Sequence, residues 1–512
     1  MANIRQYIGA RYTIKIYENS QDASSAEWEA NTSYEPLVMV TYNNSSYLSK
    51  KDVPATIGNP AQNPTYWIVT GAYNGQIASL QAQIDAINNN ELPAITSQIQ
   101  ALSDRVDTLG NPVVTIAPSD APEFIKNHAT YICTGTNDQL IINEAIQQMT
   151  VGGEIHLMAG LFNVSAPILV DRDLTISGEG CAIGGRPAYT ATNGIPYGQD
   201  SAGYYQLRQN LYGITDGRNT CIRTDVDTSV IVCQTSADKI NVCFRDFFIS
   251  GYGRDRSSKA GIDILCRTDV SLIEHVSIID CYVGIYAYGL ESDNQYGYCD
   301  CLWISKCSLQ QCGVGIIARC NSSYISDNCI ADNIGIVDYR VVSAVNSGGI
   351  YITGERNSIL NNQLVYADLY CQNPCAAIRV LSKESRVVDN ICTFLNGCGI
   401  RIEAFSVQVY GNRLNYFGWS NIAGNNMGID IKDNVCDVQN NYIGSTQALP
   451  SPQVYACNYY GVASSRPLTY HKTNVSNNTF FNIITTAVDT ATLLGSSGEL
   501  NNVNNVEWSY LT

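Results

Sequence analysis

The segment Gly399-Ile-Arg-Ile-Glu-Ala-Phe-Ser-Val-Gln-Val-Tyr-Gly-Asn412 contains the two short patterns on which the fold depends. The first is Gly-Ile-x-Ile, in which alternation turns both isoleucines to one face of a strand and x to the other. The second is a β-branched residue three positions before Asn, here Val409 and Asn412. Copies of the first begin at Gly261, Gly284, Gly315, Gly349, Ala377 and Gly428, and the second recurs at Ile325/Asn328, Ile359/Asn362, Val387/Asn390, Val438/Asn441 and Val475/Asn478.

These two patterns advance along the chain together, in steps of 22 to 34 residues from the second copy onward. Strands this short cannot bury a face alone, but stacked coils cover one another's apolar rows and share one core. The alternative, an Asn- and Gly-rich β-sandwich, would not keep the two patterns in step. The sequence therefore predicts a mainly β protein built on a parallel β-helix solenoid, for which a resemblance given below implies a right-handed coil. The asparagines are expected to stack at one bend, where they tolerate a left-handed backbone.

Charge and hydropathy narrow the possible partners. The chain of 512 residues has 30 Lys and Arg against 46 Asp and Glu, a net charge of −16. Because phosphate groups are bound by clustered cations, this balance argues against nucleic acid and against an anionic membrane as partners. The N-terminus has no apolar signal segment and no run reaches transmembrane length, so we expect assembly in the cytoplasm without a signal peptide.

The 19 cysteines lack the tight spacing of a disulfide framework or of metal-binding knuckles. We therefore expect buried free thiols that serve as small packing residues, with no metal and no organic cofactor. Two close pairs, Cys299/Cys301 and Cys371/Cys375, are weaker candidates for a disulfide or a metal site. The cysteines expected to point inward are Cys281, Cys307, Cys312, Cys329, Cys392 and Cys398.

Residues 1–75 form a separate segment that is rich in aromatic residues and turns. Alternation in Leu37–Tyr42 and Ser46–Ser49, around the turn Asn43-Asn44, predicts the short strands of a small β module. Its tyrosines and tryptophans are expected to fill the core of the module.

A heptad pattern follows in residues 76–112, divided into two pieces with a shift of register by Asn88-Asn-Asn90 and Pro93. A helix whose only apolar stripe is such a seam buries it against copies of itself, and Ile-rich seams favour three strands over two. We expect a trimeric coiled-coil neck, and a helical hairpin packed on its neighbours is the alternative. The seam residues are Ile77, Leu80, Ile84, Ile87, Ile95, Ile99, Leu102, Val106 and Leu109.

The rest of the chain divides into three parts. Residues 113–130 are expected to be an extended linker, residues 131–482 the β-helix with its loop excursions, and residues 483–512 a C-terminal strand or trimer contact. Near the start of the β-helix, the pattern of residues 134–148 predicts an amphipathic helix. The apolar side of this helix is expected to contain Leu140, Ile141, Ala145 and Ile146.

The N-terminal segment resembles a known module. Several of its phrases, in the same order, are similar to the N-terminal module of tail-fibre, tailspike and preneck-appendage proteins of phages that infect Gram-positive bacteria. The resemblance implies that residues 1–75 anchor a fibre to the virion, and a looser similarity to small chitin-binding modules implies glycan binding instead. The phrases are Gln6–Tyr12, Tyr34–Tyr42, Ser46–Pro54, Ile57–Pro60 and Tyr66–Asn74.

A second resemblance begins at Tyr131. The order of helix, Gly-Gly strand and Ile176-Ser-Gly-Glu-Gly180 is similar to the first coil of pectate-lyase-like right-handed β-helices. In that family a helix caps the N-terminal end of the solenoid. The resemblance covers the chain to Gly180 by motif and the later coils by pattern only.

If the isoleucines of Gly-Ile-x-Ile point inward, the x positions form an outward row, and the residues two positions later form a second. Neighbouring coils lie about 4.8 Å apart, so these side chains share one face. Tyrosine rings beside charged groups suit a polysaccharide; a solvated sheet face is the alternative, and Trp303 and Trp419 are possible additions. The candidate glycan-binding residues are Tyr286, Tyr288, Tyr351, Arg379 and Arg401.

Glycoside hydrolysis needs two carboxylates, about 5–5.5 Å apart for retention and 6.5–9.5 Å apart for inversion. Glu403 and Asp430, expected on adjacent coils, are the candidate catalytic pair, and Glu291 and Asp293 with Asp300 are the alternative. A lyase would need a base and a cation instead, and a site shared between subunits is a third route. The residues do not decide between these reactions.

Together with the resemblance, these features predict a homotrimeric phage tailspike or appendage that is part of the virion. Residues 1–75 are expected to attach it to tail or appendage proteins, and the β-helix to bind a cell-wall or capsular polysaccharide of the host surface. Whether it also depolymerises that polysaccharide stays open. The alternatives are a receptor-binding fibre without catalysis and a bacterial polysaccharide lyase or hydrolase, against which the missing signal segment speaks.

Overall fold

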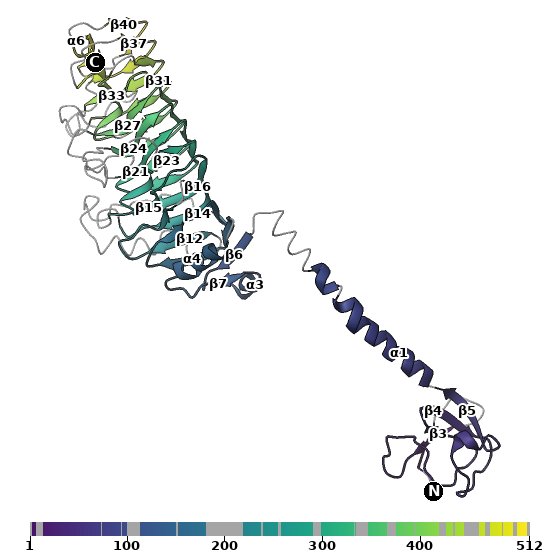
Figure 1. Ribbon diagram of the computed structural model, residues 1–512. Coiled ribbons are helices and arrows are strands. Elements are labelled where there is room, and N and C mark those ends of the chain that lie inside the picture. Colours follow the sequence, from purple (N-terminus) through teal and green to yellow (C-terminus); the bar gives the residue numbers. More distant parts are fainter. Residues whose placement is uncertain are drawn as a thin grey trace. The chain divides into compact units, whose positions relative to one another are not determined.

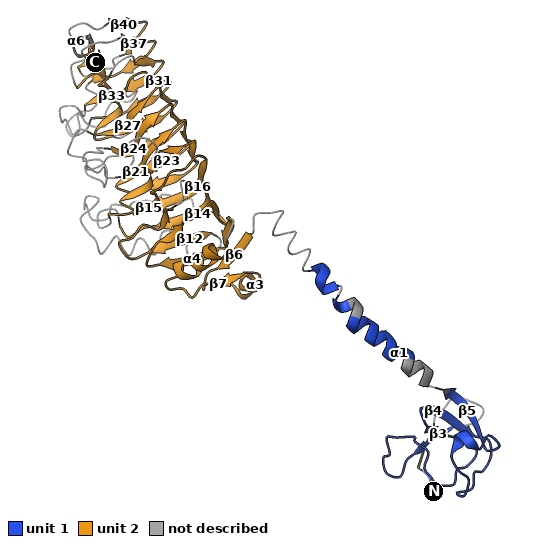
Figure 2. Ribbon diagram, viewed as in Figure 1, with its two compact units in different colours: residues 1–110 blue, residues 111–512 orange. Residues whose placement is uncertain are grey.

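The computed structural model divides the chain into two compact units, residues 1–110 and residues 111–512 (Figure 2). No helix among the residues that the structure describes is long and apolar enough to span a membrane. The structure describes residues 3–6, 14–72, 74–93, 95–99, 113–149, 152–180, 219–236, 239–253, 258–289, 298–331, 333, 347–365, 375–393, 395–418, 426–433, 436–444, 460–465, 472–483, 485–494 and 499–508.

The first unit contains a five-stranded sheet with the strand order β1-β2-β3-β4-β5. Strands β3 and β4 are antiparallel, and Asn43 and Asn44 between them are both left-handed, as the predicted hairpin turn requires. The rings of Tyr17, Tyr34 and Trp67 are buried and meet edge to face, so they form the core of this module. The elements are β1 (Asn3–Gln6), β2 (Lys15–Glu18), β3 (Val38–Tyr42), β4 (Ser45–Ser49), the 3₁₀ helix η1 (Pro60–Gln62) and β5 (Trp67–Ala72).

Helix α1 (Asn74–Ala86) follows this sheet and passes into a π-helical turn, η2 (Ile87–Glu91). A π turn closes its hydrogen bonds one residue further along than an α-helix, and this one lies where the heptad pattern shifts its register by one. The predicted seam residues Leu102, Val106 and Leu109 lie outside the described residues. Seam residues that are exposed in the single chain are Leu80, Ile84, Ile87, Ile95 and Ile99.

The second unit is a parallel β-helix, which confirms the predicted fold (Figure 1). Its first sheet contains the Gly-Ile-x-Ile segments, each paired in parallel with the corresponding segment one coil further on. The strands of the first sheet are β10 (Ile168–Val170), β13 (Ile231–Cys233), β15 (Ala260–Ile264), β17 (Val283–Ala287), β21 (Val314–Asn321), β24 (Ser347–Glu355), β27 (Ala376–Lys383), β30 (Cys398–Ile402), β33 (Met427–Ile431), β36 (Tyr460–Ala463) and β39 (Thr486–Val488), with β18 (Cys299–Asp300) beside β21.

The second sheet has two arms, because each coil crosses it in two short strands separated by a bend. The first arm contains β19 (Leu302–Ser305), β22 (Tyr324–Ser326), β25 (Ser358–Leu360), β28 (Arg386–Val388), β31 (Gln408–Tyr410), β34 (Asp437–Gln439), β37 (Lys472–Ser476) and β40 (Glu499–Val503). The second arm contains β20 (Ser308–Gln310), β23 (Cys329–Ala331), β26 (Gln363–Val365), β29 (Ile391–Thr393), β32 (Arg413–Asn415), β35 (Tyr442–Gly444), β38 (Thr479–Phe481) and β41 (Val506–Trp508).

The β-helix begins and ends outside the predicted limits of 131 and 482. The predicted linker 113–130 contains a strand, β6, which pairs with β8, because Ile116 and Ala117 belong to the core. At the other end β40 and β41 pair with β37 and β38, so the coils continue to Trp508 and the predicted final strand is present. The remaining elements are β6 (Val113–Ala117), α3 (Glu123–Lys126), β7 (Tyr131–Ile132), α4 (Gln139–Gln148), β8 (Gly153–Leu157), β9 (Gly160–Val164), β11 (Leu174–Gly178), β12 (Thr220–Thr224), β14 (Val242–Ser250), β16 (Ser271–Ile279) and α6 (Thr490–Leu494).

Helix α4 packs against the first coil with three of its four predicted apolar residues, because Ala145 and Ile146 are buried and Ile141 packs against the core. It buries Ile142, Ala145 and Ile146, whereas Leu140 is 64% exposed. Position 142 lies three residues before 145 and four before 146, so these three share one face, and Leu140 lies off it. The helix therefore contributes to the core as predicted, with Ile142 in place of Leu140.

A ladder of asparagines closes the bend between the two arms. Each Nδ2 donates to the Oδ1 of the next asparagine, as from Asn390 to Asn412 and from Asn412 to Asn441, at 2.9 and 3.0 Å. Each Oδ1 also accepts the backbone N–H of the preceding asparagine. These buried amides are thereby satisfied inside the solenoid. The ladder includes Asn505, one rung beyond the sequence pattern.

Close approach between neighbouring coils explains why glycine begins the Gly-Ile-x-Ile segments. A Cβ at Gly399 would lie 2.7 Å from the carbonyl oxygen of Gly428.

The cysteines among the described residues are free thiols, and most of those expected to point inward are buried. Cys329 is the exception, because it occupies an outward position of β23.

Candidate functional site

A row of polar side chains lies along one corner of the solenoid, where the first sheet ends. Asp300, Asn321, Glu355 and Lys383 are the last residues of β18, β21, β24 and β27 and stand in register on successive strands. We call these four residues the corner row. Because parallel strands lie about 4.8 Å apart, the two carboxyl-bearing residues, two strands apart, are separated by about 9.6 Å along the row.

Backbone conformation creates this corner. The residue after each member of the corner row is left-handed, although none of these residues is Gly. Before the corner, Gly354 has φ of +112°, and a Cβ there would lie 2.0 Å from the carbonyl oxygen of Cys320. The turn therefore brings neighbouring backbones close together beside Glu355. The left-handed residues are Cys301, Ser322, Arg356 and Glu384.

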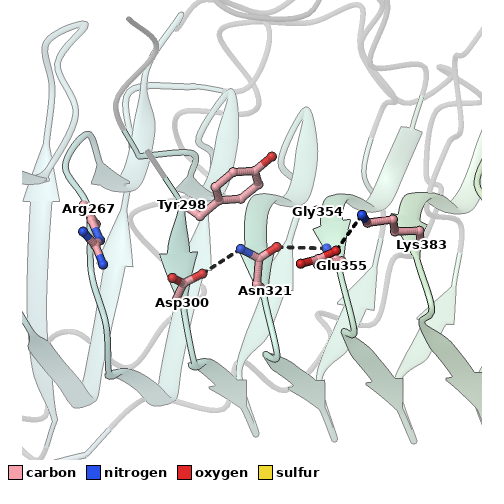
Figure 3. A pocket seen from close by; sticks show the side chains of 7 residues that line it. All are labelled: Arg267, Tyr298, Asp300, Asn321, Gly354, Glu355 and Lys383. Carbon is pink, nitrogen blue, oxygen red and sulfur yellow. Dashed lines mark hydrogen bonds and ion pairs between the residues drawn. The ribbon is translucent and has the colours of Figure 1, made fainter. Parts of the chain in front are cut away.

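The corner row forms the floor of a cavity of about 370 Å³. Arg267, Tyr298 and Gly354 complete its lining. Figure 3 shows the four side chains in line along neighbouring strands, with the ring of Tyr298 above Asp300 and Asn321. The guanidinium of Arg319 lies 4.4 Å from the centroid of that ring, which holds the ring by a cation–π contact.

Hydrogen bonds connect the row from end to end. Asn321 Nδ2 donates to Asp300 Oδ1 at 2.9 Å, and the backbone N–H of Glu355 donates to Asn321 Oδ1 at 3.0 Å. Lys383 Nζ lies 2.7 Å from Glu355 Oε2, and Arg356 Nη2 lies 2.8 Å from Glu355 Oε1. Asn321 therefore lies between the two acidic residues and holds the carboxylate of Asp300 and the backbone of Glu355, whereas Lys383 and Arg356 hold the carboxylate of Glu355.

The cations keep Glu355 ionised. The hydrogen bond from Lys383 lowers the pKa of the Glu355 carboxyl below its usual value, and Arg356 adds to this effect. The same hydrogen bond raises the pKa of Lys383. Glu355 is thus a carboxylate over the whole neutral range, suited to accept a proton or to hold a hydroxyl.

The structure places the predicted site residues in the expected row but buries most of them. Tyr351, Arg379, Arg401 and Asp430 follow one another in register, in line with Tyr286. The expectation of an open groove on this face is wrong for these residues, because both faces of β17, β30 and β33 are buried. The exposed fractions are 1% for Tyr286, 8% for Tyr288, 1% for Tyr351, 1% for Arg401 and 0% for Asp430.

The three tyrosines belong to a second apolar cluster, outside the main core. Tyr286 and Tyr288 stack with their ring centroids 5.6 Å apart, and the cluster also contains Val283, Val314 and Ile317. Burial raises the pKa of Tyr351, so its phenol stays neutral. These rings stabilise the outer face of the first sheet, and their role in glycan binding stays a prediction.

Ion pairs engage both carboxylates of the predicted catalytic pair. Glu403 Oε2 lies 2.7 Å from Arg379 Nη2, and its Oε1 lies 3.3 Å from Lys432 Nζ. Burial raises the pKa of Glu403, but Arg379 and Lys432 outweigh it and hold that pKa below its usual value. Asp430 accepts from Arg401 Nε at 2.9 Å and from the backbone and hydroxyl of Ser465. A catalytic role for this pair stays a prediction.

Of the alternative acids, Asp300 belongs to the corner row, whereas Glu291 and Asp293 lie outside the described residues, as does Trp419. The sequence analysis missed the rest of the row, although a signal exists. Arg267, Asn321, Glu355 and Lys383 each lie six positions after the first residue of a Gly-Ile-x-Ile segment. A polar residue at this constant offset marks the same place in successive coils.

The described residues contain no group of three or more His, Cys, Asp and Glu side chains that could hold a metal ion. The side chains that line the cavity include two carboxylates, an amide, a lysine, an arginine and a tyrosine. This set suits recognition of a hydroxyl-rich ligand and proton transfer to and from it.

No protein-family model matches the chain, and no curated protein matches it in sequence. Among solved structures, DFA-IIIase from Arthrobacter chlorophenolicus A6 is 14% identical with a TM-score of 0.47, over 77% of this chain and 94% of that one. The same enzyme in complex with DFA-III is 13% identical with a TM-score of 0.47 over the same shares. The enzymatically active domain of tailspike protein 2 from bacteriophage CBA120 is 13% identical with a TM-score of 0.44, over 67% of this chain and 45% of that one.

Proposed function

We propose that this chain is a phage tailspike or appendage protein that binds a polysaccharide of the host surface and hydrolyses it at the corner row. The observation that supports the proposal is the cavity in which Asp300 and Glu355 flank Asn321 beneath the ring of Tyr298. Incubating the purified protein with cell-wall and capsular polysaccharides tests it, because an enzyme releases reducing ends whereas a binding protein only co-sediments.

The spacing of the two strands that carry Asp300 and Glu355 favours hydrolysis with inversion. Two strand steps give about 9.6 Å, close to the 6.5–9.5 Å of inverting enzymes, whereas retention needs about 5–5.5 Å. In this mechanism Glu355 takes a proton from water, and the water oxygen bonds to the anomeric carbon. The glycosidic bond breaks as Asp300 gives a proton to the leaving oxygen. Asn321 holds the two groups apart with room for that water.

A receptor-binding fibre without catalysis is the second candidate. Both oxygens of Glu355 already accept hydrogen bonds from cations, Lys383 and Arg356. A carboxylate held in this way can bind sugar hydroxyls without becoming a base. Under this alternative the protein retains the glycan in the cavity and releases no reducing ends.

We also propose that α1 and the helical residues after it form the neck of a homotrimer. Leu80, Ile84 and Ile87 are 58%, 49% and 44% exposed in the single chain, and burial between copies would remove this apolar seam from water. We expect the full chain to have three times the mass of one chain in analytical ultracentrifugation. Ile84→Asp should shift this toward smaller species, because each copy would place a charge in the seam.

Ala82→Asp is the matched control, since residue 82 lies on the same helix but off the seam. It should leave the mass unchanged. A monomeric wild-type chain at micromolar concentration would contradict the proposed trimer.

The first unit is proposed to dock the protein to the virion. Its aromatic residues fill the core of the module, which leaves the backbone and outer side chains for docking. Deleting residues 1–75 is expected to abolish incorporation into phage particles and to leave glycan binding unchanged. Quantitative immunoblotting of purified particles measures the first, and co-sedimentation with polysaccharide the second. Normal incorporation of the truncated chain would remove the docking role.

A further inference from the structure

Two aromatic side chains are exposed on the first arm of the second sheet. Trp303 on β19 is 53% exposed and Tyr324 on β22 is 39% exposed. They stand opposite each other in register and meet edge to face, with ring centroids 5.4 Å apart. We call Trp303 and Tyr324 the aromatic platform.

The fold does not require the platform. Leu302 and Ile304, on either side of Trp303, fill the core and are fully buried, as alternation in a strand demands. Trp303 points away from that core and keeps about half of its surface in water. An exposed ring does not provide the stabilisation that burial of its apolar surface would give. We therefore infer that Trp303 serves to bind a ligand.

On two coils, the chain passes from the corner row to the platform within three residues. Trp303 follows Asp300 by three residues and Tyr324 follows Asn321 by three, with the left-handed Cys301 and Ser322 in between. Three residues of chain span at most about 11 Å, so the backbone of each platform residue lies within that distance of the backbone of the corner row on the same coil. A ligand of several units in the cavity can pass around the corner onto the rings.

The ligand that suits these rings is a glycan. The ring of a sugar has apolar C–H faces that pack on an aromatic ring, and hydroxyls at its edge that need polar partners. Ser305 and Ser326 lie two positions after Trp303 and Tyr324, on the same face, and supply such partners. A protein partner fits less well, because two rings among serines offer far less than the roughly 800 Å² per side of a stable interface.

We propose that the aromatic platform is a second glycan subsite, which holds the part of the polysaccharide chain that extends from the corner row. This inference rests on the proposed function of the corner row. It adds that the protein binds a longer stretch of the polysaccharide than the cavity alone holds. It implies preference for a polymer over its short fragments, since a fragment held in the cavity does not reach the rings.

The test compares Trp303→Ala with wild type in the full chain. The probes are the wall or capsular polysaccharide that the protein is found to bind, and short oligosaccharides prepared from it. We expect the Kd for the long polysaccharide to rise about tenfold, as loss of one aromatic contact gives, with the Kd for the fragments unchanged. Tyr410→Ala is the matched control, because Tyr410 is 47% exposed on the same arm, three strands further along. It should change neither Kd.

The other outcomes separate this inference from the proposal on which it rests. If Trp303→Ala binds the long polysaccharide as tightly as wild type, the platform is not a subsite, while the corner row stands. If wild type binds no polysaccharide, both are overturned. A change of molar mass in Trp303→Ala would assign the rings to contact between copies and would also overturn the inference.

Discussion

Asp300→Asn and Glu355→Gln are each expected to lower the rate of polysaccharide cleavage by about 10²–10⁴-fold, with glycan binding and folding retained. Each change keeps the shape of the side chain and removes its ability to transfer a proton. Asn at position 300 can still accept from Asn321 Nδ2, and Gln at position 355 can still accept from Lys383. Reducing ends released per minute measure the rate, and co-sedimentation measures binding.

Glu403 and Asp430, the pair predicted from the sequence, provide the matched comparison for Asp300 and Glu355. Glu403→Gln and Asp430→Asn change the same chemical groups on β33 and next to β30, where both carboxylates are held by ion pairs. If these two variants lose turnover while remaining folded, and the variants of the corner row do not, catalysis belongs to the sequence-predicted pair. If all four retain turnover, neither pair is catalytic.

Two further measurements characterise the mechanism. Inversion predicts that the first product seen by NMR has the anomeric configuration opposite to that of the bond cleaved. Glu355 has a lowered pKa and acts as the base, so its working form exists above that pKa and is lost as the pH falls through it. Activity should therefore persist on the acid side to below the ordinary value for Glu, about 4.3.

Arg401→Met is expected to destabilise the β-helix by about 3–5 kcal/mol, because it leaves the Asp430 carboxylate in the interior without its cation. The side chains of Arg401 and Asp430 are 2% and 0% exposed, and Arg401 Nε lies 2.9 Å from Asp430 Oδ2. Burial lowers the pKa of Arg401, but Cys398 and Asp430 outweigh it and hold that pKa above its usual value, so the arginine is charged. The shift of the denaturant midpoint in a matched set of variants measures the loss.

Two controls identify the cause. Removing both charges, in Arg401→Met with Asp430→Leu, should recover most of the loss, because the desolvation cost of both ions disappears together with their attraction. Lys306→Met breaks an exposed ion pair with Glu274 and should leave the midpoint unchanged. An Arg401→Met protein as stable as wild type would mean that water or a rearranged side chain neutralises Asp430.

Much of the fold follows from local pattern. The Ile residues of Gly-Ile-x-Ile alternate with x, and this alternation alone determines which side chains enter the core, as the paired strands confirm. The asparagine pattern likewise located the ladder except for Asn505, which follows Asn502 instead of a β-branched residue. The predicted limits of the solenoid were wrong at both ends, because β6 and the last coil become strands only by pairing with a neighbour.

The candidate site was less accessible to sequence analysis. The predicted row of Arg401 is in register as expected, but the sequence does not say what covers a face, and here Tyr286 and Tyr351 are buried. Asp300 appeared in the sequence analysis only as an alternative, with partners on a loop. Its neighbours in the structure, Asn321 and Glu355, come from later coils.

By itself, the sequence determined that short strands recur with their apolar side chains on one face, and hence that the coils stack. The alternation can be seen within each strand, because it depends only on neighbouring positions in the sequence. Only the tertiary structure decided where the corner lies and which outward residues stay in water. The corner is made by left-handed residues as ordinary as Cys301, Ser322 and Arg356, which no local preference marks, and exposure depends on segments distant in the chain.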